Sequence, residues 1–386
     1  MGRSKMKRTL GLLLISAIGV EAGSLAEAFS LAKVNGYLRG TYQAHDVKDD
    51  KTYEDDALGG KLHIETGEAY GISAGASFYT SNAVFNNDNK GLVPLRGESY
   101  KSYSILGEAY LKAEFGKSML KVGRQEIETP FAQVDDIGMV PNTFEAAVFE
   151  SHEIQDTSIF LGQLQKMSGV DAESVDTFKK INGSSNVQVL GVTYEGISDL
   201  TLAGWYYNLK DGEVDKIAYL EADYEKELGE MTYGVGLQYA NQGYSVGQTA
   251  KVYGGTFSAT ANKLGLTVAT AYTEVHDNAA TSGFGGGPFF SNSEYLILDN
   301  AGKDGKATWF GSEYDASNIG LEGLVLGLGQ VTLENEIGKE ARELDFTASY
   351  EINKATEIHL IASKLKGANV GEDDAKHLRV FANYNF

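Results

Sequence analysis

Hydrophobic and polar residues alternate with a period of two along most of this chain, and the pattern is clearest near its two ends. In residues 34–43, Val34, Leu38 and Tyr42 share one face, and the opposite face is polar. Residues 377–386 alternate in the same way. Successive side chains of a β-strand point to opposite faces, so both segments are predicted strands.

The same alternation recurs between the two ends, and no amphipathic helix of comparable clarity competes with it. The clearest examples are residues 61–65, 72–78, 105–115, 218–224, 233–239 and 343–350. The chain is therefore predicted to be an all-β protein built of many antiparallel strands.

A soluble β-sandwich and a transmembrane β-barrel both contain alternating strands. Here the polar faces are rich in Gly, Ser, Thr and Tyr, as the enclosed lumen of a barrel would be. Several apolar faces end in an aromatic residue, as in the girdles at membrane interfaces. These residues are Tyr42, Phe78, Phe115, Tyr224, Tyr239, Tyr350 and Phe386. The pattern favours a transmembrane antiparallel β-barrel, and the alternative is an exported acidic β-sandwich that acts as a surface adhesin or ligand-binding protein.

The first residues have the order of a secretory signal. Basic residues precede an apolar run over residues 10–20, and small residues follow it. The run is shorter than the ~20 residues of a spanning helix. We therefore predict that residues 1–22 are a signal peptide removed after Ala22, with Ala28 as the second choice; Met6 is an alternative start.

Residues 23–386 would then form the barrel, and at ~20 residues per strand with its connection they predict about 18 strands. A barrel of this size encloses an aqueous lumen, which infolded loops must narrow. Two segments break the strand pattern with clustered Gly and Pro, residues 126–144 and residues 275–308. We expect the first to be a constriction loop and the second to be a long loop.

Composition narrows the function classes. The chain has no Cys, which excludes disulfide-stapled and thiolate-metal proteins. It has 33 Lys and Arg residues and 53 Asp and Glu residues. The resulting net charge of -20 repels nucleic acid. None of the six histidines lies in an HExxH motif, and neither a GxSxG nor a Walker motif occurs. We therefore predict no catalytic residue, no metal site and no cofactor.

The region from residue 123 to residue 145 also carries a family resemblance. It contains Gly123-Arg124-Gln125, Thr129-Pro130, Asp135-Asp136-Ile137, Met139-Val140-Pro141 and Asn142-Thr143-Phe144-Glu145. This string resembles the third-loop region of OprD-type outer membrane porins, and further short matches extend over nearly the whole mature chain. The resemblance implies an 18-stranded barrel in the Gram-negative outer membrane that passes amino acids, peptides or small carboxylates. It also implies a ladder of basic wall residues and an acidic pocket, although Gly138 stands where the family pattern has a basic residue.

The polar faces of the predicted strands and the two loops supply the candidate site. The expected channel-lining residues are Arg39, Glu65, Glu108, Arg124, Asp135, Asp136, Asp345 and Arg379, and the expected loop pocket holds Ser291, Asn292 and Asp299. Arg124 would act either as a guide for solutes or as an anchor. Acids outnumber bases on the lumen side, which favours modest cation selectivity. The alternative is that neighbouring acids and bases pair and set no net field.

The C-terminus and the charged loops suggest partners besides small polar solutes. Tyr384 and the terminal Phe386 resemble the assembly signal that the outer-membrane insertion machinery reads. Acidic clusters such as Asp49-Asp50 are expected to meet divalent-bridged lipopolysaccharide beside the outer-membrane lipid. Porins of this size also occur as trimers, so a homotrimer is a further expectation.

Overall fold

The structure is a computed structural model that describes residues 24–87, 93–97, 100–183, 185–210 and 212–386. Within these residues, nineteen strands form one antiparallel sheet that closes on itself, because β1 (Lys33–Val47) pairs with both β2 (Thr52–Glu65) and β19 (Asp374–Asn385). The predicted signal peptide lies outside the described residues.

Eighteen of these strands make up the closed ring, because the two-residue β8 (Lys179–Lys180) pairs with β7 alone in the described sheet and β7 pairs directly with β9. The other strands are β3 (Ile72–Asn87), β4 (Tyr103–Phe115), β5 (Ser118–Gln125), β6 (Thr143–Ser151), β7 (Thr157–Ser168), β9 (Val187–Ile197), β10 (Leu200–Asn208), β11 (Val214–Leu228), β12 (Met231–Tyr244), β13 (Ala250–Ala261), β14 (Leu266–His276), β15 (Lys306–Asp315), β16 (Leu324–Glu334), β17 (Glu340–Asn353) and β18 (Thr356–Lys366). The prediction of an all-β barrel of about 18 strands is confirmed, and the β-sandwich alternative is wrong.

In the described part of the chain, helical structure is confined to short segments. They are α2 (Leu25–Ser30), α3 (Leu298–Ala301), η2 (Ala316–Ile319) and η3 (Ala368–Val370). Among the described helices, none has the length and apolar character needed to cross a membrane.

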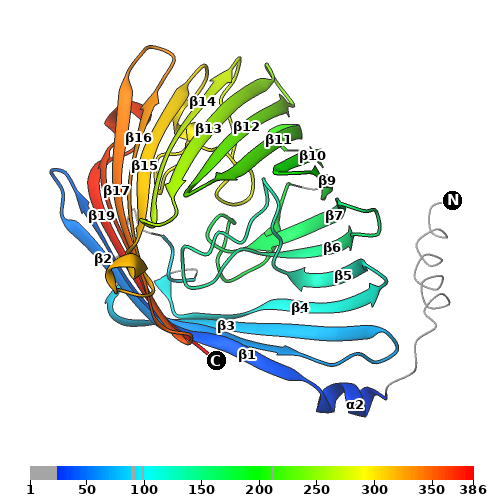
Figure 1. The fold of residues 1–386 in the computed structure, drawn as a ribbon. Helices are drawn as coiled ribbons and strands as arrows, with labels where there is room; N and C mark the ends of the chain where they lie inside the picture. Colours follow the sequence, from blue (N-terminus) through cyan, green and yellow to red (C-terminus); the bar gives the residue numbers. More distant parts are fainter. Residues whose placement is uncertain (1–23, 88–92, 98–99, 184, 211) are drawn as a thin grey trace.

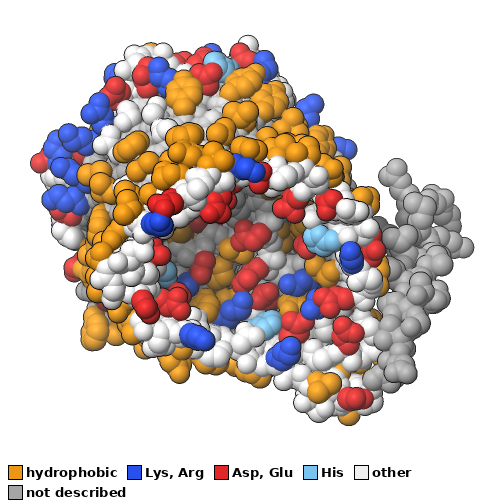
Figure 2. Space-filling model, in the orientation of Figure 1, with side chains coloured by type: hydrophobic (Ala, Val, Ile, Leu, Met, Phe, Trp, Pro, Cys, Tyr) orange, Lys and Arg blue, Asp and Glu red, His pale blue; other side chains and the backbone are white. Residues whose placement is uncertain are grey.

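The two faces of the sheet differ as the alternation predicts. On β1, Leu38 is 58% exposed on the outside, whereas its neighbour Arg39 is 6% exposed on the inside. Figure 2 shows hydrophobic side chains over much of the visible outer surface and charged side chains gathered in the central hollow. An apolar outer face and a polar interior are the arrangement that a lipid-embedded barrel requires.

Two connections fold into the barrel instead of extending from it (Figure 1). The first inner loop, residues 126–142, joins β5 to β6, and the second inner loop, residues 277–305, joins β14 to β15. Compared with the segments expected from sequence, β6 takes the last two residues of the first, and β14 and β15 take two and three residues at the ends of the second. Residues 169–183, after β7, also contact the first inner loop, which the sequence pattern did not predict.

An apolar cluster inside the barrel fixes the two inner loops to the wall. Phe131 of the first inner loop is fully buried and makes edge-to-face contacts with Tyr207, Tyr219 and Phe289, at ring-centroid distances of 5.5, 5.6 and 5.9 Å. Phe289 belongs to the second inner loop, so one side chain joins both loops to β10 and β11. Full burial of a Phe side chain stabilises by about 1.5–3 kcal/mol.

Candidate functional site

The two inner loops are bonded to each other where they cross the lumen. The backbone N–H of Phe284 donates to the carbonyl oxygen of Phe131 at 2.8 Å, and that of Gln133 donates to the carbonyl oxygen of Phe284 at 3.2 Å. Next to the crossing, Gly285 has a φ of 128°, and a Cβ there would lie 2.8 Å from the carbonyl oxygen of Gln133. Glycine is therefore required for this close approach.

Arg39 on β1 holds the first inner loop. Its two terminal nitrogens contact the Asp136 carboxylate at 2.6 and 2.8 Å, a bidentate pair. The guanidinium also donates to the carbonyl oxygen of Gly138 at 2.8 Å and to Asn383 of β19 at 2.8 Å. Arg39 therefore lines the lumen with all three of its nitrogens engaged.

The packing around Gly138 explains its departure from the family pattern. A Cβ at this position would lie 2.9 Å from a methyl group of Val170 and 3.4 Å from one of Val93. The Val170 methyl would therefore have to shift to admit any side chain at this position, whereas the distance to Val93 is an ordinary contact. Arg39 reaches the same stretch of the loop from the wall instead.

Arg379 on β19 holds the second inner loop through an ion pair with Glu294. The Arg379 side chain is 1% exposed, and its Nε and its other terminal nitrogen have no hydrogen-bond partner among the described residues. A cavity of about 410 Å³ lies beside it and is also lined by Arg39, Asp136 and Glu294. Arg39 and Arg379, two of the three arginines expected at the channel, thus border one small cavity.

Asp135 lies near this cavity, beside a second carboxylate. Burial and the neighbouring Asp171 raise the pKa of Asp135 to about 7. Asp171 is held in place by Asn142, whose amide nitrogen donates to it at 2.6 Å. Asp135 therefore carries its full negative charge only above neutral pH. Its neighbour Asp136 forms the ion pair with Arg39.

Acids on β17 also support the second inner loop. The Glu343 carboxylate accepts hydrogen bonds from the backbone N–H groups of Tyr295, at 3.1 Å, and Leu296, at 2.6 Å. Two residues along the same face, Asp345 accepts a hydrogen bond from the Ser293 hydroxyl. Asp345 thus lies on the same face of β17 as Glu343, beneath the second inner loop.

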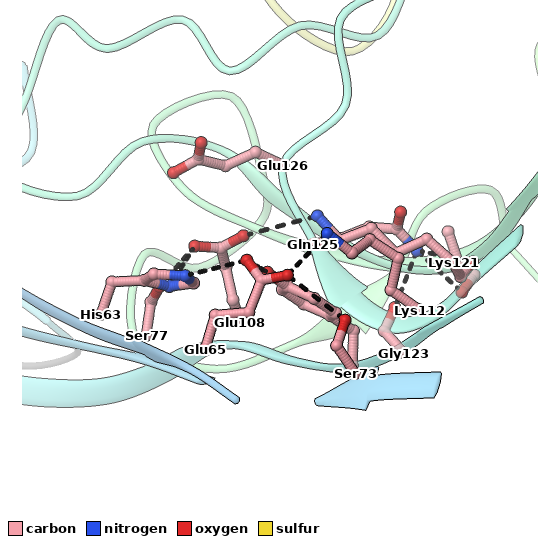
Figure 3. Close-up of polar contacts among 12 residues, drawn as sticks. His63, Glu65, Ser73, Ser77, Glu108, Lys112, Lys121, Gly123, Gln125 and Glu126 are labelled. Carbon is pink, nitrogen blue, oxygen red and sulfur yellow. Dashed lines mark hydrogen bonds and ion pairs between the residues drawn. The ribbon is translucent and has the colours of Figure 1, made fainter. Parts of the chain in front are cut away.

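A second cluster, the wall network, covers the lumen face of β2 to β5. It comprises Lys61, His63, Glu65, Glu108, Lys112, Lys121 and Glu126. Lys61 contacts Glu108 at 3.0 Å and Glu126 at 2.8 Å, and Lys112 contacts Glu65 at 2.6 Å. Figure 3 shows the labelled acidic and basic side chains of this network gathered on one patch of the wall.

Glu108 is the centre of the wall network. It is 4% exposed, accepts a hydrogen bond from the Ser77 hydroxyl, and also has Lys121 within 3.9 Å and the His63 ring within 3.8 Å. Glu65 and Glu108 are both paired with lysines of the wall network. For these two residues the structure therefore shows pairing between neighbouring acids and bases, the alternative to a negatively charged lumen. Their contribution to a net negative field is correspondingly small.

Arg124 lies on the other side of the wall. Its guanidinium contacts Glu145, the residue opposite it on β6, at 3.1 Å. On β6, Phe144 and Ala146 are buried in the cluster inside the barrel, so Glu145 between them points outward. The expectation that Arg124 lines the channel is wrong. Its alternative role as an anchor fits the structure, because it also donates to the carbonyl oxygen of Leu106 at 3.1 Å.

Two of the three residues of the expected loop pocket, Asn292 and Asp299, make hydrogen bonds within the second inner loop, whereas the buried hydroxyl of Ser291 has no hydrogen-bond partner among the described residues. Asp299 accepts hydrogen bonds from the backbone and hydroxyl of Ser282, at 2.7 and 2.8 Å, and Asn292 accepts one from the backbone of Leu298 at 2.9 Å. Ser291 is fully buried. These contacts hold the second inner loop in shape, so the three residues do not form an open pocket. Over the described ranges, no group of three His, Asp or Glu side chains is arranged to hold a metal ion.

The last strand ends on the outer face. The backbone N–H of Phe386 donates to the carbonyl oxygen of Gly36, and that of Gly36 donates to Phe386, both at 3.0 Å. The side chains of Tyr384 and Phe386 are about half exposed. The terminal aromatic residues are therefore ordered against β1 and remain accessible from outside the barrel.

Comparisons with known proteins match this architecture. The family model described as outer membrane porin, OprD family, matches residues 80–386. The crystal structures of Pseudomonas aeruginosa OccK9 (OpdG) and of a BenF-like porin from Pseudomonas fluorescens Pf-5 are each 18% identical and superpose with TM-scores of 0.79 and 0.80. Pseudomonas aeruginosa OpdK, solved with vanillate, is 17% identical with a TM-score of 0.75. Each comparison covers 93% of this chain and 99% of the other. At this identity the likeness shows the fold, and a search of curated proteins found no match.

Proposed function

Because the chain belongs to the OprD family of outer membrane porins, we propose that it is a passive channel for small polar solutes with a modest preference for cations. Porins are channels rather than enzymes, and the family places this chain in the outer membrane as a multi-strand barrel. The cavity of about 410 Å³ at the inner loops is matched to solutes of the size of amino acids, short peptides or small organic acids.

The observation that carries the cation preference is the uneven pairing of charges around the lumen. Lys61, Lys112, Arg39 and Arg379 each have an acidic partner. In contrast, two pairs of lumen-facing acids, Glu221 with Asp223 and Glu343 with Asp345, have no Lys or Arg partner within the described part of the chain; the two acids of each pair interact with each other, so each pair, and not each acid, contributes a negative charge. Unpaired carboxylates leave a negative field, which favours cations in a pore.

Reversal potentials in planar bilayers test this proposal. Under a KCl gradient we expect discrete conductance steps and a cation-selective potential. The double variant Glu221→Gln with Asp223→Asn should move the potential toward zero, because it removes the negative charge of an acidic pair that has no described Lys or Arg partner. The matched variant Glu230→Gln with Glu322→Gln removes two charges from turns at the barrel end and should leave the potential unchanged. An anion-selective wild-type channel would contradict the cation preference, and folded protein without conductance would contradict the channel itself.

The packing of α2 supports signal cleavage after Ala22. Ser24 caps this helix by accepting from the backbone of Glu27, and Ala28 is buried with its carbonyl oxygen bonded to Gly67 at 2.9 Å. Cleavage after Ala28 would remove this packed segment, whereas cleavage after Ala22 keeps it. We therefore expect the mass of the mature protein to match residues 23–386. A mature protein that begins at Phe29 would contradict this expectation.

Three expectations about partners stay predictions. The accessible Tyr384 and Phe386 support recognition of the last strand by the outer-membrane insertion machinery. Acidic residues in the connection between β1 and β2 support contact with divalent-bridged lipopolysaccharide. Assembly into a homotrimer is the third prediction.

A further inference from the structure

The outer face of the barrel carries a group of basic side chains at one end of β17, β18 and β19. The connections at that end of the barrel include both inner loops. The turns at the opposite end include four of only two residues, 116–117, 198–199, 229–230 and 354–355. In outer-membrane barrels the short turns lie in the periplasm and the longer loops lie outside the cell. The basic group is therefore at the extracellular end.

Four residues form this group, here called the basic patch: Arg342 on β17, Lys364 and Lys366 on β18, and Lys376 on β19. Arg342 lies opposite Lys366 in the sheet. Lys364 lies opposite Lys376. Directly opposite residues share a face, and like charges in such positions destabilise the pairing of strands. Leu344, two residues after Arg342 on the same face, is 43% exposed, so the patch faces outward.

The acids beside the basic patch do not balance its charge. Three of them lie on the same outer face and each contacts a base other than Lys364 or Lys366: Glu340 with Arg342, Asp46 with Lys376, and Asp374 with Lys48. Asp374 lies opposite Lys366, but its other carboxylate oxygen accepts from the backbone of Ala368 at 3.4 Å. Lys364 and Lys366 have no ion-pair partner among the described residues, in a chain whose net charge is -20.

Three of the four basic groups converge on one small cavity. Arg342, Lys364 and Lys366 line this space of about 150 Å³ on the outer surface. The acid in its lining, Glu343, has its carboxylate bonded to the backbone of Leu296 inside the barrel, so that carboxylate points away from the cavity. Arg342 and Lys366 also line a second cavity, of about 550 Å³, that extends to η3. The site is thus suited to an anion attached to a larger group.

We infer that the basic patch binds a phosphate group of lipopolysaccharide in the outer leaflet. Arg and Lys groups that converge on one point bind phosphate through charge-assisted hydrogen bonds. Lipopolysaccharide carries phosphates where its sugars meet its acyl chains. The patch lies at the matching level of the wall, because Leu344 and then Phe346, 42% exposed, continue the same face toward the periplasm. Lysine side chains reach from such an apolar surface to the polar interface.

This contact differs from the two roles proposed above. Acidic loops would meet lipopolysaccharide through divalent cations, whereas Lys364 and Lys366 would bind its phosphate directly. The patch also faces away from the lumen, so the inference goes beyond the proposed channel and does not depend on it.

The test is a titration of the purified, folded protein in detergent with lipid A, the acylated and phosphorylated anchor of lipopolysaccharide. EDTA is present, and native mass spectrometry measures the bound fraction. We expect saturable binding of one lipid A per chain. The double variant Lys364→Gln with Lys366→Gln should weaken binding roughly tenfold or more, because each basic residue beside an anionic lipid surface adds to the attraction.

A matched variant controls for the loss of charge. Lys33→Gln with Lys354→Gln removes two exposed lysines at the periplasmic end, which also have no ion-pair partner among the described residues, and it should bind lipid A as the wild type does. Substitutions of exposed residues rarely unfold a protein. Folding of each variant is checked by heat-modifiable migration on a gel.

Three results would overturn the inference. Equal binding by the Lys364 and Lys366 double variant would show that the patch is not the site. Equal binding of lipid A stripped of its phosphates would show that the wall recognises acyl chains alone. Binding that occurs only without EDTA would show a contact bridged by divalent cations. Single-channel conductance of the double variant should equal that of the wild type, so the result bears on the lipid site and not on the channel.

Discussion

Replacing residues 283–295 with a short Gly-Ser linker is expected to increase single-channel conductance several-fold. This part of the second inner loop crosses the lumen, where Phe289 packs against Phe131 and Tyr295 stacks on His377 with ring centroids 3.7 Å apart. Its removal enlarges the open cross-section while leaving the hydrogen-bonded ring of strands complete. The measurement is the size of single-channel steps in planar bilayers.

The control for this deletion is a linker of the same kind in place of residues 335–339, which join β16 to β17 outside the lumen. That variant should conduct as the wild type does. If the deletion of 283–295 gives folded, heat-modifiable barrels with unchanged step size, the second inner loop does not narrow the channel, and the permeability barrier lies elsewhere.

Arg379→Gln is expected to release the second inner loop. It leaves the Glu294 carboxylate without its buried partner, and breaking a buried ion pair costs about 3 kcal/mol or more. A loss of about 3 kcal/mol raises the population of the undocked loop about 100-fold, and cleavage by a protease follows that population. Chymotrypsin, which cuts after residues such as Phe289, should therefore nick the loop about 100-fold faster.

The double variant Arg379→Gln with Glu294→Gln is the control for this prediction. It removes both charges, so it should recover much of the loss, because two neutral amides in contact do not leave a buried charge unpaired. Equal cleavage rates for the single and double variants would show that the ion pair does not hold the loop. In bilayers the single variant should also be more cation-selective, since it removes one positive charge from the lumen.

The strands were predictable because a single rule, alternation with a period of two, applies to each of them separately. Arg39 and Glu108 could be assigned to the lumen from their own strands alone. Arg124 could not, because β5 has only eight residues and Gly123 within it has a φ of 133°, which obscures the alternation near the first inner loop. A short strand with an irregular residue offers too few alternating positions to decide which side chains point into the lumen.

The partners of the lumen residues could not be predicted, because they come from distant parts of the chain. Arg39 and Asp136 are 97 residues apart, and Arg379 and Glu294 are 85 residues apart. A local sequence pattern does not show that an acid in a loop will pair with a base on a strand that is distant in the sequence.

The pairing of β1 with β19 is the one place in the described ring where strands from opposite chain ends meet. Arg39 and Arg379 both lie along this junction, and each receives a different inner loop. Arg39 also donates to Asn383 of β19 across this junction, so the side chain that holds the first inner loop has all of its contacts only once the first and last strands have paired. Closing the barrel therefore also completes the contacts that position the first inner loop within the lumen.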